Sequence, residues 1–286
     1  MDLVDFLAAP LRSGIERHAL AEVVLLGGVC GALSFWVTSF RLSYASESLA
    51  HGLLPGLVLA SLAGAPLLLG GVGGVALAAA MVALASRDPR IGADSATAVV
   101  VTGMFGLGAL LALSPDAPAR LEELLFGDPL GVTDADLGAA AALATLGAGA
   151  LAALHRPLCA VALDPPGAGA LGVRPGVVRL ALLMLLAAAV AVAVQGLGSL
   201  LVLAVLVAPA VAVRRRAVSP VTAMLGGAAV GSGCGVLGLY ASHHLGSAAG
   251  ASVALALCAA AALGGRLPAR IRRGAAPASG VHRASA

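Results

Sequence analysis

The chain has 286 residues, of which 60% are hydrophobic and only 11% are charged, and its formal net charge at pH 7 is +3. Soluble domains carry about 25% charged residues, so a chain this apolar cannot cover its surface with polar side chains in water. The small net charge, with arginines gathered in short clusters, gives little support for nucleic-acid binding. The composition therefore indicates a membrane protein.

Apolar runs long enough to cross a bilayer follow one another along the chain, whereas a membrane barrel would show short alternating segments. One run contains Pro209 and is short, so we expect a re-entrant or half-length helix that lines a cavity there. We predict an all-α, polytopic membrane helical bundle of about eight or nine transmembrane helices. The runs lie near 20–38, 47–64, 66–86, 95–114, 137–154, 177–194, 197–212, 221–240 and 249–265.

Three parts of the chain are distinguished by composition. Residues 1–19 form an N-terminal segment without the pattern of a removable signal peptide. Residues 20–265 hold the membrane helices. Residues 266–286 are basic and lack periodicity, so we expect a disordered tail whose arginines contact anionic lipid.

The arginines predict the orientation of the helices, because cytoplasmic loops carry an excess of positive charge. The acidic segment 115–136 then falls outside. The start of the chain is left open, because counting backwards places Arg41 inside and the N-terminus outside, whereas Arg12 and Arg17 favour the opposite. The arginines assigned to the cytoplasm are Arg87 and Arg90, Arg156, Arg174 and Arg179, Arg214 to Arg216, and those from Arg266 to Arg273.

Several rings lie near the ends of predicted helices. Trp36, Tyr44 and Tyr240 are expected in the headgroup zone, where amphipathic rings are favoured. His243 and His244 follow at an outer helix end, where they could collect a metal or remain solvated. No other ligand is near them in sequence, so solvation is the favoured interpretation.

The segment 41–56, which reads RLSYASESLAHGLLPG, places a carboxylate and an imidazole at the mouth of a membrane helix. Glu47 and His51 are four residues apart, so on a helix they share one face and can bind a divalent metal together. Pro55 cannot donate to the carbonyl of His51, which predicts a kink and a third oxygen ligand. Ionisable groups inside a membrane are costly and normally mark a pathway. A Glu47–His51 hydrogen bond without metal remains the alternative.

Sites for covalent or hydrolytic chemistry are missing from the sequence. It contains no HExxH, GxSxG or Walker motif, and no dinucleotide fingerprint, which requires a strand before its glycine-rich turn. An intramembrane hydrolase that uses His51 would lack a nucleophile. The chain is therefore expected not to be an enzyme, and any ATP must be hydrolysed by a separate partner chain.

The segment 41–56 resembles the signature of metal-uptake ABC transporter permeases of the zinc/manganese/iron class, in which Asp usually stands where this chain has Glu47. The resemblance covers about residues 20–265 and makes this region a transmembrane permease domain. It continues, in the family's order, through ADSATAVVVTGMFGLGALLALS, LLFGDPLGVTDADL, LDPPGAGALGV and QGLGSLLVLAVLVAPAVAVRRR.

The resemblance implies a multi-pass subunit of the plasma (inner) membrane of a bacterium. It implies a homodimer that forms the translocation path with cytoplasmic ABC ATPase subunits and an extracytoplasmic metal-binding protein. Glu47 and His51 would bind the transported zinc, manganese or iron, and no cofactor would be bound permanently. Imidazole and carboxylate suit all three metals, and the sequence does not choose among them.

Two segments are candidates for coupling to the ATPase. The resemblance favours the one after the last quoted motif, and the loop 164–173 is the second. The residues of the favoured segment are Arg214, Arg215, Arg216, Ser219 and Pro220.

Two other functions remain open. A permease for an iron chelate or a corrinoid would share the architecture, but its pathway should lack the pair of Glu47 and His51. A non-transporting structural or regulatory membrane subunit would bind partner proteins without moving a substrate.

Overall fold

In the computed structural model, residues 13–85, 93–114 and 131–266 are described, and they form helices and turns without a strand. Arg87, Arg90, most of the acidic segment 115–136 and the basic tail lie outside these residues. The helices are α2 (Gly14–Ser39), α3 (Ser43–Gly52), α4 (Leu54–Leu62), α5 (Leu67–Ala85), α6 (Ala93–Ala112), α8 (Asp134–Leu163), α9 (Pro165–Ala170), α10 (Pro175–Leu197), α11 (Ser199–Val213), α12 (Pro220–Leu245) and α13 (Ala249–Arg266).

The prediction of an all-α membrane helical bundle is confirmed. Within the described ranges, α2, α8, α10, α12 and α13 are long and apolar enough to span a bilayer. Three further apolar stretches are shorter, and they lie at Leu69–Val82, Thr97–Ala112 and Leu201–Val213.

Local chemistry shifts some helix ends from their predicted places. α2 begins six residues before the predicted run because the Ser13 hydroxyl accepts the Glu16 N–H at 3.0 Å and caps the helix. α8 continues through Pro157 as far as Leu163. The stretch 165–170, predicted as part of a loop, forms the short helix α9.

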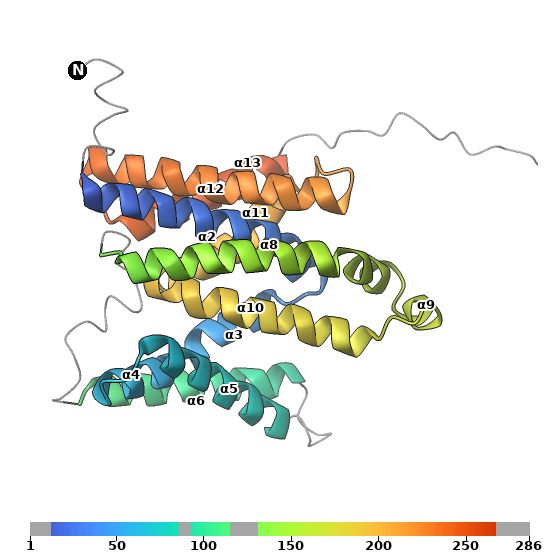
Figure 1. The fold of residues 1–286 in the computed structure, drawn as a ribbon, viewed down its shortest axis with the longest axis horizontal. Coiled ribbons are helices and arrows are strands. Elements are labelled where there is room, and N and C mark those ends of the chain that lie inside the picture. The colour runs from blue at the N-terminus through green and yellow to red at the C-terminus, as the bar shows by residue number, and fades with distance from the viewer. Residues whose placement is uncertain (1–12, 86–92, 115–130, 267–286) are drawn as a thin grey trace, which may run out of the picture.

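The helices stack in two groups joined by α3. Figure 1 shows α2, α11, α12 and α13 along one side, α8 and α10 next to them, and α4, α5 and α6 on the other side. α3 lies between the groups and packs against α6, α10 and α11. We call α4, α5 and α6 the small block and the remaining helices, apart from α3, the large block.

α2 and α12 cross antiparallel along a seam of glycines. A Cβ on Gly27 would lie 2.8 Å from the carbonyl carbon of Gly231, and one on Gly31 would overlap the backbone of Gly227. Small residues four apart let two membrane helices approach until their backbones touch. This glycine seam, Gly27 and Gly31 against Gly227 and Gly231, fixes the pairing of the two helices.

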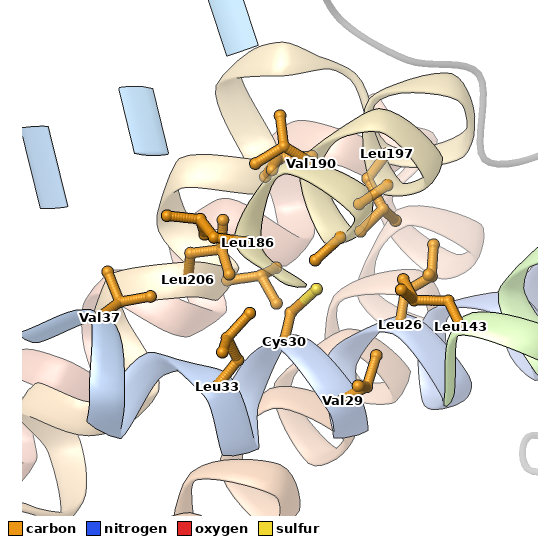
Figure 2. Close-up of a cluster of buried hydrophobic side chains, with 14 of the residues drawn as sticks. Leu26, Val29, Cys30, Leu33, Val37, Leu143, Leu186, Val190, Leu197 and Leu206 are labelled. Carbon is orange, nitrogen blue, oxygen red and sulfur yellow. The ribbon is translucent and has the colours of Figure 1, made fainter. Parts of the chain in front are cut away.

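The large block has the main core. Figure 2 shows buried side chains from several helices gathered there, among them Leu33 of α2, Leu186 of α10 and Leu206 of α11, each with 0% of its surface exposed. Trp36 is also buried, at 1% exposure, and its indole N–H donates to Met224 Sδ at 3.2 Å. Trp36, which was predicted to lie in the headgroup zone, is thus inside the protein, where its ring fills the contact between α2 and α12.

The two ends of the bundle differ in charge. At one end, hereafter the arginine end, Arg41 lines one hollow with Arg214 and another with Arg179. At the opposite end, the Glu16 carboxylate lies 2.6 Å from His243 Nδ1, and Asp134 lies 3.5 Å from His18. The start of α2 therefore lies opposite the arginine end, which agrees with counting backwards from the arginine clusters.

Five helices end on a residue with positive φ, a conformation that favours glycine, and α10 is one of them, with Gly198 at φ of 77°. α4, α9 and α12 use Gly64, Gly172 and Gly246, with φ of 62°, 77° and 63°. α2 uses Arg41 with φ of 55°. The Arg41 N–H donates to Thr38 O at 3.2 Å, and the next N–H donates to Val37 O at 2.7 Å. A side chain here costs about 1 kcal/mol relative to glycine.

Candidate functional site

The predicted metal pair lies on a helix that breaks immediately after it. α3 ends at Gly52, Leu53 forms a turn, and α4 begins at Leu54 with Pro55 in its first turn. Proline lacks the backbone N–H that would continue the hydrogen bonds of a helix, but it is tolerated in the first turn of a helix. The kink predicted from Pro55 is thus present as a break between two helices.

Glu47 and His51 lie one turn apart on α3, and both are half-buried. The His51 ring packs edge-on against Phe105 of α6, with ring centroids 5.2 Å apart and an interplanar angle of 76°. Within the described part of the chain, no hydrogen bond joins Glu47 to His51. The carboxylate and the imidazole are therefore available to a ligand.

A single copy of the chain supplies few metal ligands at this point. Among the residues that the structure describes, no three His, Cys, Asp or Glu side chains come together in a way that could hold a metal ion. Within the described part of the chain, Glu47 and His51 are therefore not joined by a third side-chain ligand.

The favoured coupling segment forms the turn between α11 and α12. Arg214, Arg215 and Arg216 are exposed. Ser219 caps α12 by accepting the Thr222 N–H at 3.2 Å, and Pro220 is the first residue of α12. This turn lies beside Arg41 in a hollow of about 680 Å³.

The second coupling segment is a short helix at the tip of the molecule. Figure 1 shows α9 projecting beyond the ends of α8 and α10. Asp164 caps α9 by accepting the Gly167 N–H at 3.1 Å. Leu163 and Leu171, on either side of α9, are 86% and 78% exposed.

Sequence reasoning missed the groups that meet at the end opposite the arginines. His243, expected to be solvated, contacts Glu16, which is 227 residues away along the chain. Glu22 is buried, with 1% of its surface exposed, and its Oε2 has no hydrogen-bond partner in the described structure. The signal for Glu22 was present, because it is an acid inside an apolar run.

Comparisons with known proteins agree with the fold and the motifs. A "probable iron transport system membrane protein" of Haemophilus influenzae is 27% identical over 253 residues, covering 88% of this chain and 93% of that protein. The "manganese import system permease protein ScaB" of Streptococcus gordonii is 27% identical, covering 84% and 86%. The solved structure "PsaBC from Streptococcus pneumoniae in complex with Fab" has a TM-score of 0.87 at 22% identity, covering 93% and 96%. That likeness shows the fold. The model of the ABC 3 transport family matches residues 14–264, and the chain therefore belongs to that family.

Proposed function

We propose that this chain is the membrane permease subunit of an ATP-driven importer for a divalent metal ion. The observation that carries the proposal is the pair of Glu47 and His51 on α3, between the two blocks and directly before a helix break. Imidazole and carboxylate suit zinc, manganese and ferrous iron. The relatives named for manganese and iron transport support these two metals first.

The helices fit eight or nine passages through a bilayer. α3 and α4 together form one passage, and the 15 residues of α11 form a half-length one, since about 22 Å of helix is less than the ~30 Å of hydrocarbon. The arginine end lies in the cytoplasm under the positive-inside rule. The end with Glu16 and His243 then faces the extracytoplasmic metal-binding protein.

The transport mechanism is alternating access. In a homodimer with two-fold symmetry, each copy would carry its own Glu47 and His51. The ion must leave as well as enter, so binding is transient rather than tight. Helix re-packing is driven by ATP hydrolysis on the partner subunits.

The two rival functions predict different behaviour. An iron chelate or a corrinoid would bury its metal in its own ligands, so Glu47 and His51 would be dispensable. A structural or regulatory subunit would show no metal-dependent phenotype.

Growth under chelation tests the proposal and names the metal. Cells that lack the gene are rescued by the wild type, by a Glu47→Ala/His51→Ala variant, or by Ser43→Ala as a control at the start of the same helix. We expect the wild type and the control to rescue growth, and the double variant at equal membrane abundance to fail by at least tenfold in metal uptake. Added manganese, iron or zinc should restore the deletion strain.

Equal rescue by the double variant would show that the site is wrong. Absence of any metal phenotype in the deletion strain would overturn the importer itself.

We also propose that α9 is the main contact with the ATPase. Exposed leucines at the tip of a bundle are typical of a protein interface. Leu163, the last residue of α8, and Leu171 flank a helix that projects from the arginine end. The turn with Arg214, Arg215, Arg216, Ser219 and Pro220 lies at the same end and is the second contact.

A further inference from the structure

Arg41 occupies a backbone position that this chain otherwise gives to glycine. Its φ of 55° is the only positive value of a non-glycine residue in the described ranges. The ends of α4, α9 and α12 show that the fold meets the same need with glycine. A strained residue persists where its side chain has a use that glycine cannot serve.

The side chain of Arg41 lines a hollow that also contains a second arginine. The hollow lies between the last turns of α2, the end of α11 and the turn before α12, and Arg214 lines its other side. We call it the Arg41–Arg214 hollow. Thr38 and Ser39 add hydroxyl groups, and Phe35 and Val211 add apolar surface.

The described residues of this hollow carry positive charge without a carboxylate. Among the residues that the structure describes, no Asp or Glu lines it. Within the described part of the chain, neither Arg41 nor Arg214 forms an ion pair with a carboxylate. Two guanidinium groups at one hollow make a site for an oxyanion, because guanidinium binds phosphate oxygens in pairs. The hydroxyls of Thr38 and Ser39 already donate to backbone carbonyls of α2, so the anion would be bound by the two arginines.

We propose that the Arg41–Arg214 hollow binds the phosphate of an anionic phospholipid headgroup. The hollow lies where α2 and α11 reach the end of the bilayer, and basic pockets between membrane helices on the cytoplasmic side bind such headgroups. Phe35 and Val211, which is 40% exposed, offer an apolar surface to the acyl chains. The inference rests on the proposed function in one respect only, which is the assignment of the arginine end to the cytoplasm.

Lipid titration of the purified full chain in a neutral detergent tests the proposal. Thermal unfolding is followed while phosphatidylglycerol, phosphatidylcholine or inorganic phosphate is added. We expect phosphatidylglycerol to raise the melting temperature in a saturable manner, with little effect of phosphatidylcholine at equal concentration. Arg41→Gly should raise the half-saturating concentration at least tenfold, although its melting temperature without lipid should equal or exceed the wild-type value.

Arg214→Gln gives an independent second variant, with the same expected tenfold loss. Arg156→Gln, which changes an exposed arginine of α8 that does not line the hollow, is the matched control and should titrate like the wild type. If Arg41→Gly and Arg214→Gln titrate like the wild type, the proposal is overturned. An equal effect of inorganic phosphate would identify a free anion as the ligand, which also overturns it.

Loss of ATPase binding in both variants with unchanged lipid titration would make the hollow a protein docking surface instead. The lipid titration measures thermal unfolding and does not depend on metal transport. Failure of the importer proposal and failure of the lipid site are therefore separate results.

Discussion

Glu22 carries a carboxylate into the packed interior of the large block. Its Oε2 has no hydrogen-bond partner in the described structure, and Gly196 of α10 packs directly against the carboxylate. Burying an ionised group without a partner costs several kcal/mol. Glutamine has the same shape and nearly the same volume as glutamate but carries no charge, so it avoids this cost.

Replacing Glu22 and, separately, its neighbour Gly196 should therefore show how much charge and shape each contribute to stability at this site. We expect Glu22→Gln to unfold at or above the wild-type melting temperature in detergent, and Gly196→Val to lose about 1–3 kcal/mol because its side chain overpacks the site. Gly176→Ala, at an open position of the same helix, is the control and should be neutral or stabilising. A clear destabilisation by Glu22→Gln would show that the carboxylate itself makes a stabilising interaction.

The residues of the candidate site could be predicted to the extent that they are close in sequence. Glu47 and His51 are four apart on one helix, so periodicity alone placed them together, and their metal role stays a prediction. Glu16 and His243 are 227 residues apart. Their contact depends on how α2 crosses α12, which no local pattern encodes.

For the helices, the lengths of the apolar runs and the positions of the prolines predicted most of the elements. The break at Leu53 and the short α11 followed from Pro55 and from the short run around Pro209. α8 runs past Pro157 because one lost backbone bond does not end a helix that the surrounding structure supports. α9 was missed because six residues rich in glycine and proline carry no helical period.

The glycine seam predicts which glycines of α2 and α12 can change. Gly31→Ala or Gly227→Ala should destabilise the protein by about 1–3 kcal/mol, because the new methyl group would overlap the facing backbone. Gly233→Ala lies on α12 in open space and should stabilise by up to about 1 kcal/mol through helix propensity. Thermal unfolding in detergent measures all three. Equal effects at all three positions would show that the helices do not touch along this seam.

For the whole molecule, the arrangement of the two ends is the main result that one sequence could not supply. The arginine rule predicted a common side for most clusters, but the start of α2 remained open. The contacts of Glu16 with His243 and of His18 with Asp134 place it at the same end as the end of α12 and the start of α8. The predicted boundaries at residues 19 and 265 remain predictions.

This arrangement predicts where the ATPase binds. A Leu163→Ser/Leu171→Ser variant should leave the metal site at Glu47 and His51 unchanged. Its affinity for the ATPase subunit should fall at least tenfold, because the interface loses two apolar side chains. Arg215→Gln/Arg216→Gln should lose less. Pull-down of the ATPase with purified permease measures both. A larger loss in the arginine variant would assign the main contact to the turn between α11 and α12.

The glycine seam also limits how the gene can vary. Every single-base change that replaces glycine with another amino acid adds a Cβ, because no other amino acid lacks one. At Gly31 and Gly227 each such change introduces a side chain where the facing backbone already lies. Random mutagenesis followed by selection for growth should therefore recover fewer amino-acid changes at these codons than at codons for glycines in open space, such as Gly149 and Gly233, where alanine and serine should be accepted.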